Sequence, residues 1–179
     1  MRYESIADIY SANEKIREGF LATIANVTDA EASALPDGEK WTVRQLVEHV
    51  AIVEQNITRL CARLVGAAKT GGKLADGNIG VSNETMAKWA ASSDAKLEAP
   101  ERVQPTGDVP IADALDQLST NIGALAALQH DLETYDMTEH KFPHPYFGDL
   151  TATEWLVLIG GHERRHTIQL EKLLTKIRQ

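Results

Sequence analysis

The chain has 179 residues, of which 43% are hydrophobic and 25% charged, a composition typical of one globular domain and unlike that of a disordered chain. No apolar run is long enough to cross a bilayer, the first residues lack the pattern of a signal peptide, and Cys61 is the single cysteine. We therefore expect a cytoplasmic protein without disulfides, with one domain over residues 1–179. The formal net charge of −8 and the lack of a clustered basic segment argue against binding to nucleic acid or to an anionic membrane surface.

Four segments have apolar residues every three or four positions, which predicts a helix with one buried face for each. They lie at about residues 4–28, 42–66, 110–136 and 151–177. The second and fourth begin at capping boxes, Thr42 with Gln45 and Thr151 with Glu154. Asn13 is a polar residue on the apolar stripe of the first helix.

The connections indicate how the helices are arranged. The first and second helices, and the third and fourth, are joined by short turn-rich segments, which favour antiparallel neighbours. About forty residues, 66–109, separate the second from the third. They are enough to cross a bundle roughly 37 Å long, and a short helix is expected in them around residues 84–91. Because strand patterns are nearly absent, we predict an all-α four-helix bundle, up-down-down-up, with a long connection between helices two and three.

Three of the six histidines stand where apolar residues are expected. His49 lies on the stripe of the second helix, and His162 and His166 lie one turn apart on the stripe of the fourth. Burying an unpaired imidazole costs a few kcal/mol, and a divalent ion would satisfy all three rings at once. We therefore predict that they hold a divalent metal. The other three are expected to be ordinary surface residues, namely His130, His140 and His144.

Residues 162–166 read HERRH and match the H-E-x-x-H motif of zinc proteases, in which Glu163 would be the general base. Only thirteen residues follow His166, and they continue the helix, so there is no place for the downstream third ligand of those proteases. Glu163 lies about 100° around the helix from His162 and is expected to point away from the metal. The chain is therefore not expected to be a protease.

The sequence resembles the DinB/YfiT-like four-helix-bundle metalloproteins over nearly its whole length. The likeness is carried by WTVRQLVEH at 41–49, residues 99–105, HPYFGDLTATEW at 144–155 and HERRH at 162–166. The resemblance implies an up-down-down-up bundle, a three-histidine site for nickel or zinc, and a homodimer. Members of this superfamily include S-transferases that use low-molecular-weight thiols (bacillithiol, mycothiol or glutathione) and a mycothiol-dependent isomerase, so the resemblance implies thiol chemistry as a candidate activity.

Three imidazoles leave an open coordination position, which is the mark of a catalytic metal site. A metal there can activate bound water, as in a hydrolase, or a small thiol, as in a transferase. Our leading hypothesis is the thiol transferase, because the resemblance favours it. Two non-catalytic alternatives stay open: a closed structural site with His140 or His144 as fourth ligand, and a protein that binds a small molecule without converting it.

Three further residues are candidates for the pocket around the metal. Asn13 and Gln129 could reach the site from the first and third helices, or could instead form ordinary interhelical hydrogen bonds. Tyr146 lies, like Trp89, in a connection that could cover the site or pack on the end of the bundle. Cys61 is one step off the apolar stripe of its helix and is expected to pack in or beside the core.

Overall fold

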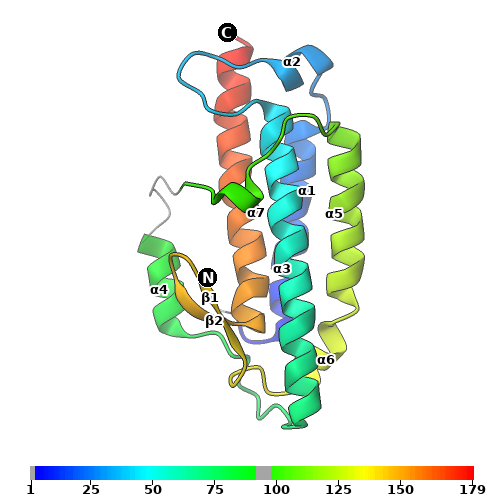
Figure 1. Ribbon diagram of the computed structural model, residues 1–179, viewed down its shortest axis with the longest axis vertical. Helices are drawn as coiled ribbons and strands as arrows, with labels where there is room; N and C mark the ends of the chain where they lie inside the picture. The colour runs from blue at the N-terminus through cyan, green and yellow to red at the C-terminus, as the bar shows by residue number, and fades with distance from the viewer. Residues whose placement is uncertain (1–2, 92–97) are drawn as a thin grey trace.

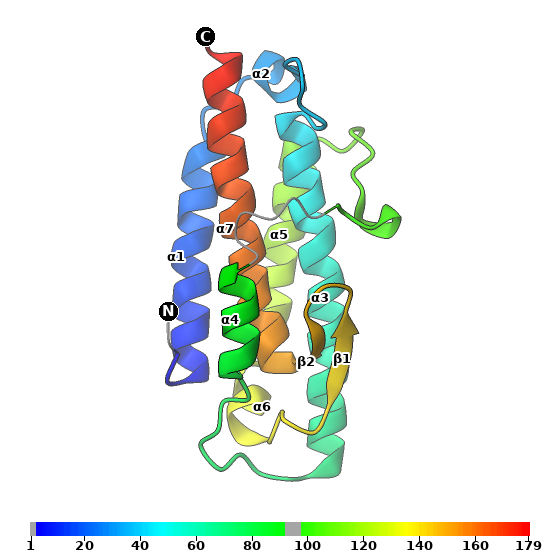
Figure 2. The same ribbon diagram turned by 90° about the vertical axis from the view of Figure 1, so that its left-hand side faces the viewer.

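The computed structural model describes residues 3–91 and 98–179, and four long helices run side by side along its length (Figure 1). They are α1 (Ile6–Ile24), α3 (Val43–Gly71), α5 (Ile111–Ala126) and α7 (Ala152–Ile177). Helix α1 runs toward the end of the molecule that holds the C-terminus, α3 and α5 run away from it, and α7 returns to it (Figures 1 and 2). The predicted four-helix bundle and its up-down-down-up order are confirmed.

Shorter elements join these helices. They are α2 (Asp29–Ser33), α4 (Asn83–Ala91), the 3₁₀ turn η1 (Glu101–Val103), α6 (Gln129–Thr134), β1 (Lys141–His144) and β2 (Gly148–Thr151). Helix α4 confirms the short helix expected around residues 84–91. It lies next to the β1–β2 hairpin on one side of the bundle (Figures 1 and 2). None of the helices in the described ranges is long and apolar enough to span a membrane.

Two helix boundaries differ from the prediction because of local capping. The first helix ends at Ile24, since Thr28 forms a second capping box with Glu31 and starts α2. The second helix continues past residue 66 and ends at Gly71. It is capped by Gly72, whose φ of +70° is the left-handed conformation that closes many helices.

The helix expected at 110–136 is two helices, α5 and α6. The carbonyl of Leu125, in the last turn of α5, accepts hydrogen bonds from the amide of Leu128 (2.9 Å) and from the hydroxyl of Tyr10 (2.6 Å). This tight turn closes α5 and redirects the chain. Helix α6 then buries Leu132 in the core.

The hairpin of β1 and β2 was not expected from the sequence. Its strands pair antiparallel from Lys141↔Thr151 to His144↔Gly148. Each strand is four residues long, and Pro143 lies within β1, so the alternating pattern of a strand is absent. Thr151 is both the last residue of β2 and the N-cap of α7, which fixes the hairpin to the start of that helix.

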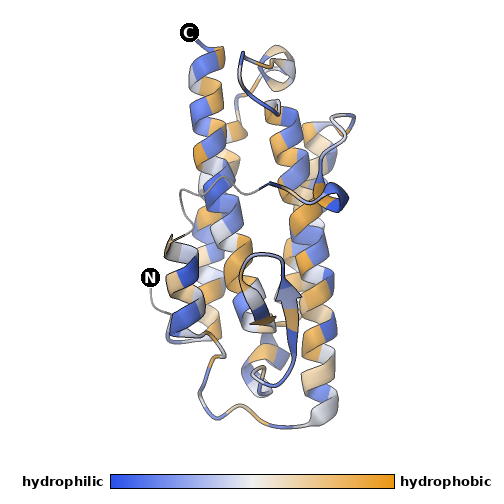
Figure 3. Cartoon of the chain, turned by 60° about the vertical axis from the view of Figure 1, so that its left-hand side comes forward, coloured by the Kyte–Doolittle hydropathy of each residue, from blue (hydrophilic) through white to orange (hydrophobic). Residues whose placement is uncertain are grey.

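The long helices carry hydrophobic and hydrophilic faces (Figure 3), and their buried apolar residues form two clusters. One cluster lies toward the α6 end and includes Ile9, Leu64, Leu125 and Leu156. The other lies toward the C-terminus and includes Phe20, Leu46, Leu118 and Leu170. Between them, each long helix contributes a buried polar side chain: Arg17, Glu54, Asn121 and Glu163. The histidines of α3 and α7 lie beside this polar layer.

Candidate metal centre

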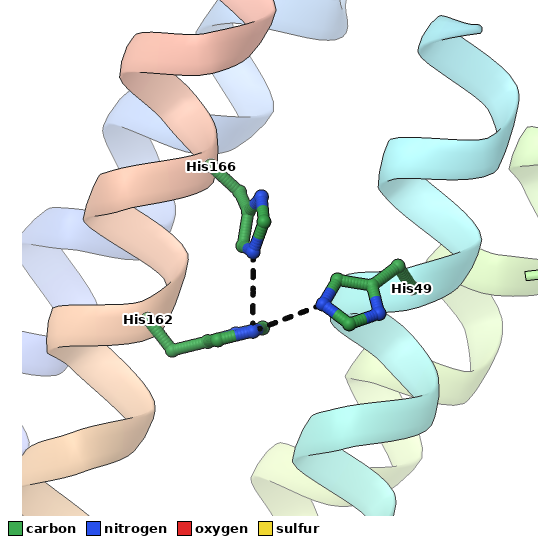
Figure 4. Close-up of side chains that lie close together, drawn as sticks. All are labelled: His49, His162 and His166. Atoms are coloured by element: carbon green, nitrogen blue, oxygen red, sulfur yellow. Dashed lines mark hydrogen bonds between the residues drawn. The ribbon is translucent and has the colours of Figure 1, made fainter. Parts of the chain in front are cut away.

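The three predicted histidines come together between α3 and α7 (Figure 4). The Nε2 atom of His162 lies 3.2 Å from Nε2 of His49 and 3.2 Å from Nε2 of His166. One ligand nitrogen from each ring lies within 4.8 Å of the other two. Within residues 3–91 and 98–179, His49, His162 and His166 form a group of three side chains whose ligand atoms are close enough together to hold one metal ion.

The spacing of these nitrogens fits a metal ion. A zinc ion binds imidazole nitrogen at about 2.0–2.1 Å with tetrahedral geometry, which places two nitrogen ligands about 3.3 Å apart. Two of the three Nε2 pairs already have a separation of 3.2 Å. The rings therefore converge as ligands of one ion would.

The hydrogen bonds made by Nδ1 of His49 and of His166 determine which ring nitrogen is available to a metal. Nδ1 of His49 lies 2.7 Å from the carbonyl oxygen of Val103, and Nδ1 of His166 lies 3.0 Å from Oε1 of Gln169. Because both oxygens are acceptors, both Nδ1 atoms carry the proton, and both Nε2 atoms present a lone pair. Nε2 of His162 faces these two lone pairs and can donate a proton to only one. A bound cation would satisfy all three nitrogens.

All three imidazoles are held neutral, the form that binds metals. Burial lowers the pKa of His49, although the hydrogen bond to Val103 opposes this shift. Burial, followed by the neighbouring His49, lowers the pKa of His166 to about 3. Burial and then the adjacent imidazoles hold the pKa of His162 well below its usual range.

Glu48, next to His49, holds the connection that reaches the site, a role that was not predicted from the sequence. Its buried carboxylate accepts hydrogen bonds from the amide (2.9 Å) and hydroxyl (2.9 Å) of Thr106 and from the amide of Gly107 (2.8 Å). The same connection carries Val103, the partner of His49. An acidic residue next to a histidine on the apolar stripe was the one sequence feature that could have indicated this role. The residues that Glu48 binds lie more than fifty positions away in the sequence, so the pairing itself could not be predicted.

Glu163 points away from the histidines, as expected. Its carboxylate accepts a hydrogen bond from Nε of Arg17 in α1, while Nη2 of Arg17 donates to Glu54 in α3. All three side chains are buried. The glutamate of the H-E-x-x-H pattern is thus committed to an ion pair between helices, which argues against the role of general base.

The three pocket candidates make their hydrogen bonds elsewhere in the described chain. The amide nitrogen of Asn13 donates to the carbonyl of Leu156 (2.9 Å), which joins α1 to α7. Gln129 donates to Glu133 (2.8 Å) in α6, at the end of the bundle away from the C-terminus. The hydroxyl of Tyr146, in the hairpin turn, donates to the carbonyl of Glu98 (2.8 Å).

The two candidate fourth ligands differ in position. Nε2 of His140 lies 3.8 Å from where a Cβ on Gly71 would stand, and Gly71 is roughly 33 Å along α3 from His49. His140 is therefore too far away to be a ligand. His144 is half-buried, not an ordinary surface residue. Its ring stacks on Phe147 with centroids 4.6 Å apart, and burial followed by the charge of Arg102 lowers its pKa to about 4.

The sequence model of the DinB superfamily matches residues 12–170. The chain belongs to the DinB superfamily. The Bacillus subtilis (strain 168) protein YuaE, described as uncharacterized, is 24% identical over 155 residues, which are 86% of this chain and 90% of that protein. Among solved structures, TT2238, described as a four-helix bundle protein, matches with a TM-score of 0.63 and 21% identity over 94% of this chain and 99% of that one. The last likeness shows a shared fold.

Proposed function

We propose that the protein is a metal-dependent enzyme that binds nickel or zinc through His49, His162 and His166. The observation that carries this proposal is the convergence of three neutral Nε2 atoms, with His162 placed 3.2 Å from each of the other two. Imidazole is a preferred ligand of both metals. Three protein ligands with an open position are typical of catalytic sites, whereas structural zinc sites are usually closed by four.

The reaction that we favour is the transfer of a low-molecular-weight thiol to an electrophile. When bound, such a metal lowers the pKa of a thiol or of water and so supplies a nucleophile near neutral pH. The protein's own thiol does not compete for this role, because Cys61 is buried and burial raises its pKa to about 12. A sulfur nucleophile would therefore come from a small molecule. Membership of the DinB superfamily is compatible with this choice.

The surrounding residues support the orientation of the ligands. Val103 and Gln169 fix the tautomers of His49 and His166. Trp41 packs against His49 with ring centroids 4.8 Å apart. Such neighbours hold ligand rings in place and keep bulk water from the ring faces.

The metal content of protein grown in metal-defined medium tests the site. We expect about one zinc or nickel ion per chain, lost in His49→Ala and in His166→Ala. His130→Ala is the matched control, because His130 is exposed in α6. Metal that is absent from the wild type and not taken up on addition would overturn the proposal.

Activity assays on the loaded protein then separate the chemistries. Turnover of an electrophile such as monobromobimane that requires an added thiol, at a rate above that seen with His49→Ala, supports the transferase. Metal-dependent hydrolysis of ester or amide substrates without a thiol would identify a hydrolase instead. Bound metal with neither activity would contradict both and leave a binding protein.

A further inference from the structure

The connection before α5 contains a segment, residues 98–108, that we call the strap. It runs over the outside of the bundle beside α3 (Figures 1 and 2). Of residues 98–108, all of which the structure describes, Val103 is the one that is buried. At the other end of the strap, Glu98 forms an ion pair with Lys40 that is fully open to solvent, and its carbonyl accepts a hydrogen bond from the exposed Tyr146 (2.8 Å). The strap therefore gains little from burial, and its attachment depends on a few polar contacts.

The buried polar contacts of the strap gather at two neighbouring residues of α3. Glu48, which is 2% exposed, accepts hydrogen bonds from the amide and hydroxyl of Thr106 and from the amide of Gly107. Nδ1 of His49, which is 4% exposed, lies 2.7 Å from the carbonyl oxygen of Val103. One of the two residues that hold the strap is thus a ligand of the candidate metal centre.

The tautomer of His49 decides whether Val103 is held. A neutral imidazole carries one proton, so Nδ1 can donate to Val103 only while Nε2 presents a lone pair. Nε2 lies 3.2 Å from Nε2 of His162, to which it could donate if the proton moved there. Nδ1 would then turn a lone pair toward the carbonyl oxygen of Val103, and the contact would become repulsive.

A metal ion on Nε2 removes this choice, because a ring nitrogen that binds a metal cannot carry a proton. The ion also makes the N–H at Nδ1 a charge-assisted donor, and hydrogen bonds of this kind are about twice as strong as neutral ones. The metal-loaded site therefore holds Val103 more firmly than the metal-free site does. Because such coupling is reciprocal, the attached strap also holds the ion more firmly.

We propose that the strap closes on α3 when the metal centre is loaded and opens when the ion leaves, so that it regulates how long the metal is retained. The contacts that carry this inference are those of His49 with Val103 and of Glu48 with Thr106 and Gly107. The inference rests on the metal-binding part of the proposed function and is independent of the reaction that the metal supports.

Hydrogen exchange of the full-length protein, metal-free and loaded with zinc, tests whether the metal closes the strap. The amides of Thr106 and Gly107 report on the strap, because both donate to Glu48. We expect zinc to slow their exchange about tenfold. The amides of Ala75 and Asp136 are the control, since their hydrogen bonds join two connections at the α6 end of the bundle. Exchange there proceeds by local opening and should change less than about twofold.

The same measurement on His162→Ala shows whether the ion acts through the metal centre. This variant lacks the ring that faces the other two but keeps His49 and the whole strap. Added zinc should leave the exchange of its strap amides unchanged. Slowing equal to that in the wild type would overturn the inference, because the effect would then come from zinc bound elsewhere.

The rate at which zinc is released to an excess of chelator measures the reciprocal effect. Gly107→Ala loosens the strap without changing a ligand, because Gly107 has a φ of +85° and a Cβ there would stand 3.2 Å from Nε2 of Gln45. We expect release about tenfold faster than from the wild type. Gly77→Ala is the matched control: its φ of +92° gives similar backbone strain, but a Cβ there meets nothing within 4 Å. Its release rate should stay within about twofold of that of the wild type.

The outcomes separate this inference from the proposed function. One bound zinc per chain, with unchanged exchange at Thr106 and Gly107, would overturn the inference and leave the metal centre intact. Equal release rates from Gly107→Ala and Gly77→Ala would overturn the role of the strap in retaining the metal. Protein that binds no zinc or nickel would overturn the metal centre and the inference with it. Because exchange is measured on the wild type, the test stays decisive even if Gly107→Ala fails to fold.

Discussion

At the scale of single residues, Arg17 holds two buried carboxylates in the middle of the bundle. It donates to Glu54 in α3 and to Glu163 in α7, so three helices meet at one guanidinium. One guanidinium is shared by two buried carboxyl groups, and Oε1 of Glu54 has no hydrogen-bond partner among the described residues. Burial, which outweighs the opposing effect of Arg17, raises the pKa of Glu54 to about 7. The raised pKa couples this residue to the stability of the fold.

We predict that Glu54 makes the protein less stable as the pH rises from about 4.5 to 7. In this range the folded protein retains a proton on Glu54, whereas the unfolded chain, with an ordinary carboxyl pKa, has lost it. The contribution is fully present below the unfolded pKa and is lost as the pH rises through the folded one. The free energy of unfolding, measured in urea across this range, should fall less steeply in Glu54→Gln than in the wild type. Glu14→Gln, at an exposed position of α1, should keep the wild-type slope, and an unchanged slope in Glu54→Gln would contradict the prediction.

Glu48 fixes the connection that reaches the metal centre. Its carboxylate holds Thr106 and Gly107, and the same connection supplies the carbonyl that orients His49. Glu48→Ala should therefore weaken metal binding by about 10–100-fold, as is usual when the partner of a ligand ring is disturbed. Competition with a chromophoric chelator measures the affinity. Glu101→Ala, at an exposed acid of η1, should leave it unchanged, and equal affinities in the two variants would show that the connection does not orient His49.

At the scale of elements, α1 and α7 approach closely at Gly160. A Cβ at this position would stand 2.2 Å from Oδ1 of Asn13 and 3.1 Å from Cδ1 of Ile16. Asn13 uses the same contact to donate to the carbonyl of Leu156. The polar interruption of the first apolar stripe thus belongs to the contact between two helices, which was the alternative to a place in the pocket.

We predict opposite effects for two neighbouring glycines of α7. Gly160→Ala should destabilise the protein by about 1–3 kcal/mol, because the added methyl group collides with Asn13. A Cβ at Gly161 meets nothing within 4 Å, so Gly161→Ala should stabilise the helix by about 0.5–1 kcal/mol. Urea unfolding of the metal-free proteins measures both. Equal effects of the two substitutions would show that the contact with α1 adjusts without cost.

How far the sequence predicts each element depends on the range of the interactions that form it. The long helices and the start of α7 follow from local periodicity and from the capping box of Thr151 and Glu154. The break between α5 and α6 involves Tyr10, more than a hundred residues away from its partner Leu125. The hairpin is short, contains Pro143 and is fixed to α7 through Thr151, so no alternating pattern marks it.

At the scale of the whole molecule, the candidate site also combines residues that local sequence patterns predict with residues whose position depends on distant contacts. His49, His162 and His166 could be predicted because each interrupts an apolar stripe, and the bundle order brings the stripes of α3 and α7 together. Val103 could not, because its place depends on the path of a long connection whose sequence has no period. Helices fix the ligands, and the connections determine what surrounds them.

Because the three histidines join α3 to α7, we predict that metal binding stabilises the whole fold. A ligand at a thousand times its dissociation constant adds about 4 kcal/mol to stability, which corresponds to a rise of roughly 10 °C in Tm for a chain of 179 residues. Scanning calorimetry of the metal-free protein, with and without added zinc, measures the shift. It should vanish in His162→Ala, which removes the ring that faces both others, and persist in His130→Ala. An equal shift in His162→Ala would mean that the stabilising ion binds elsewhere, and no shift in the wild type would mean that the histidines meet without holding a metal.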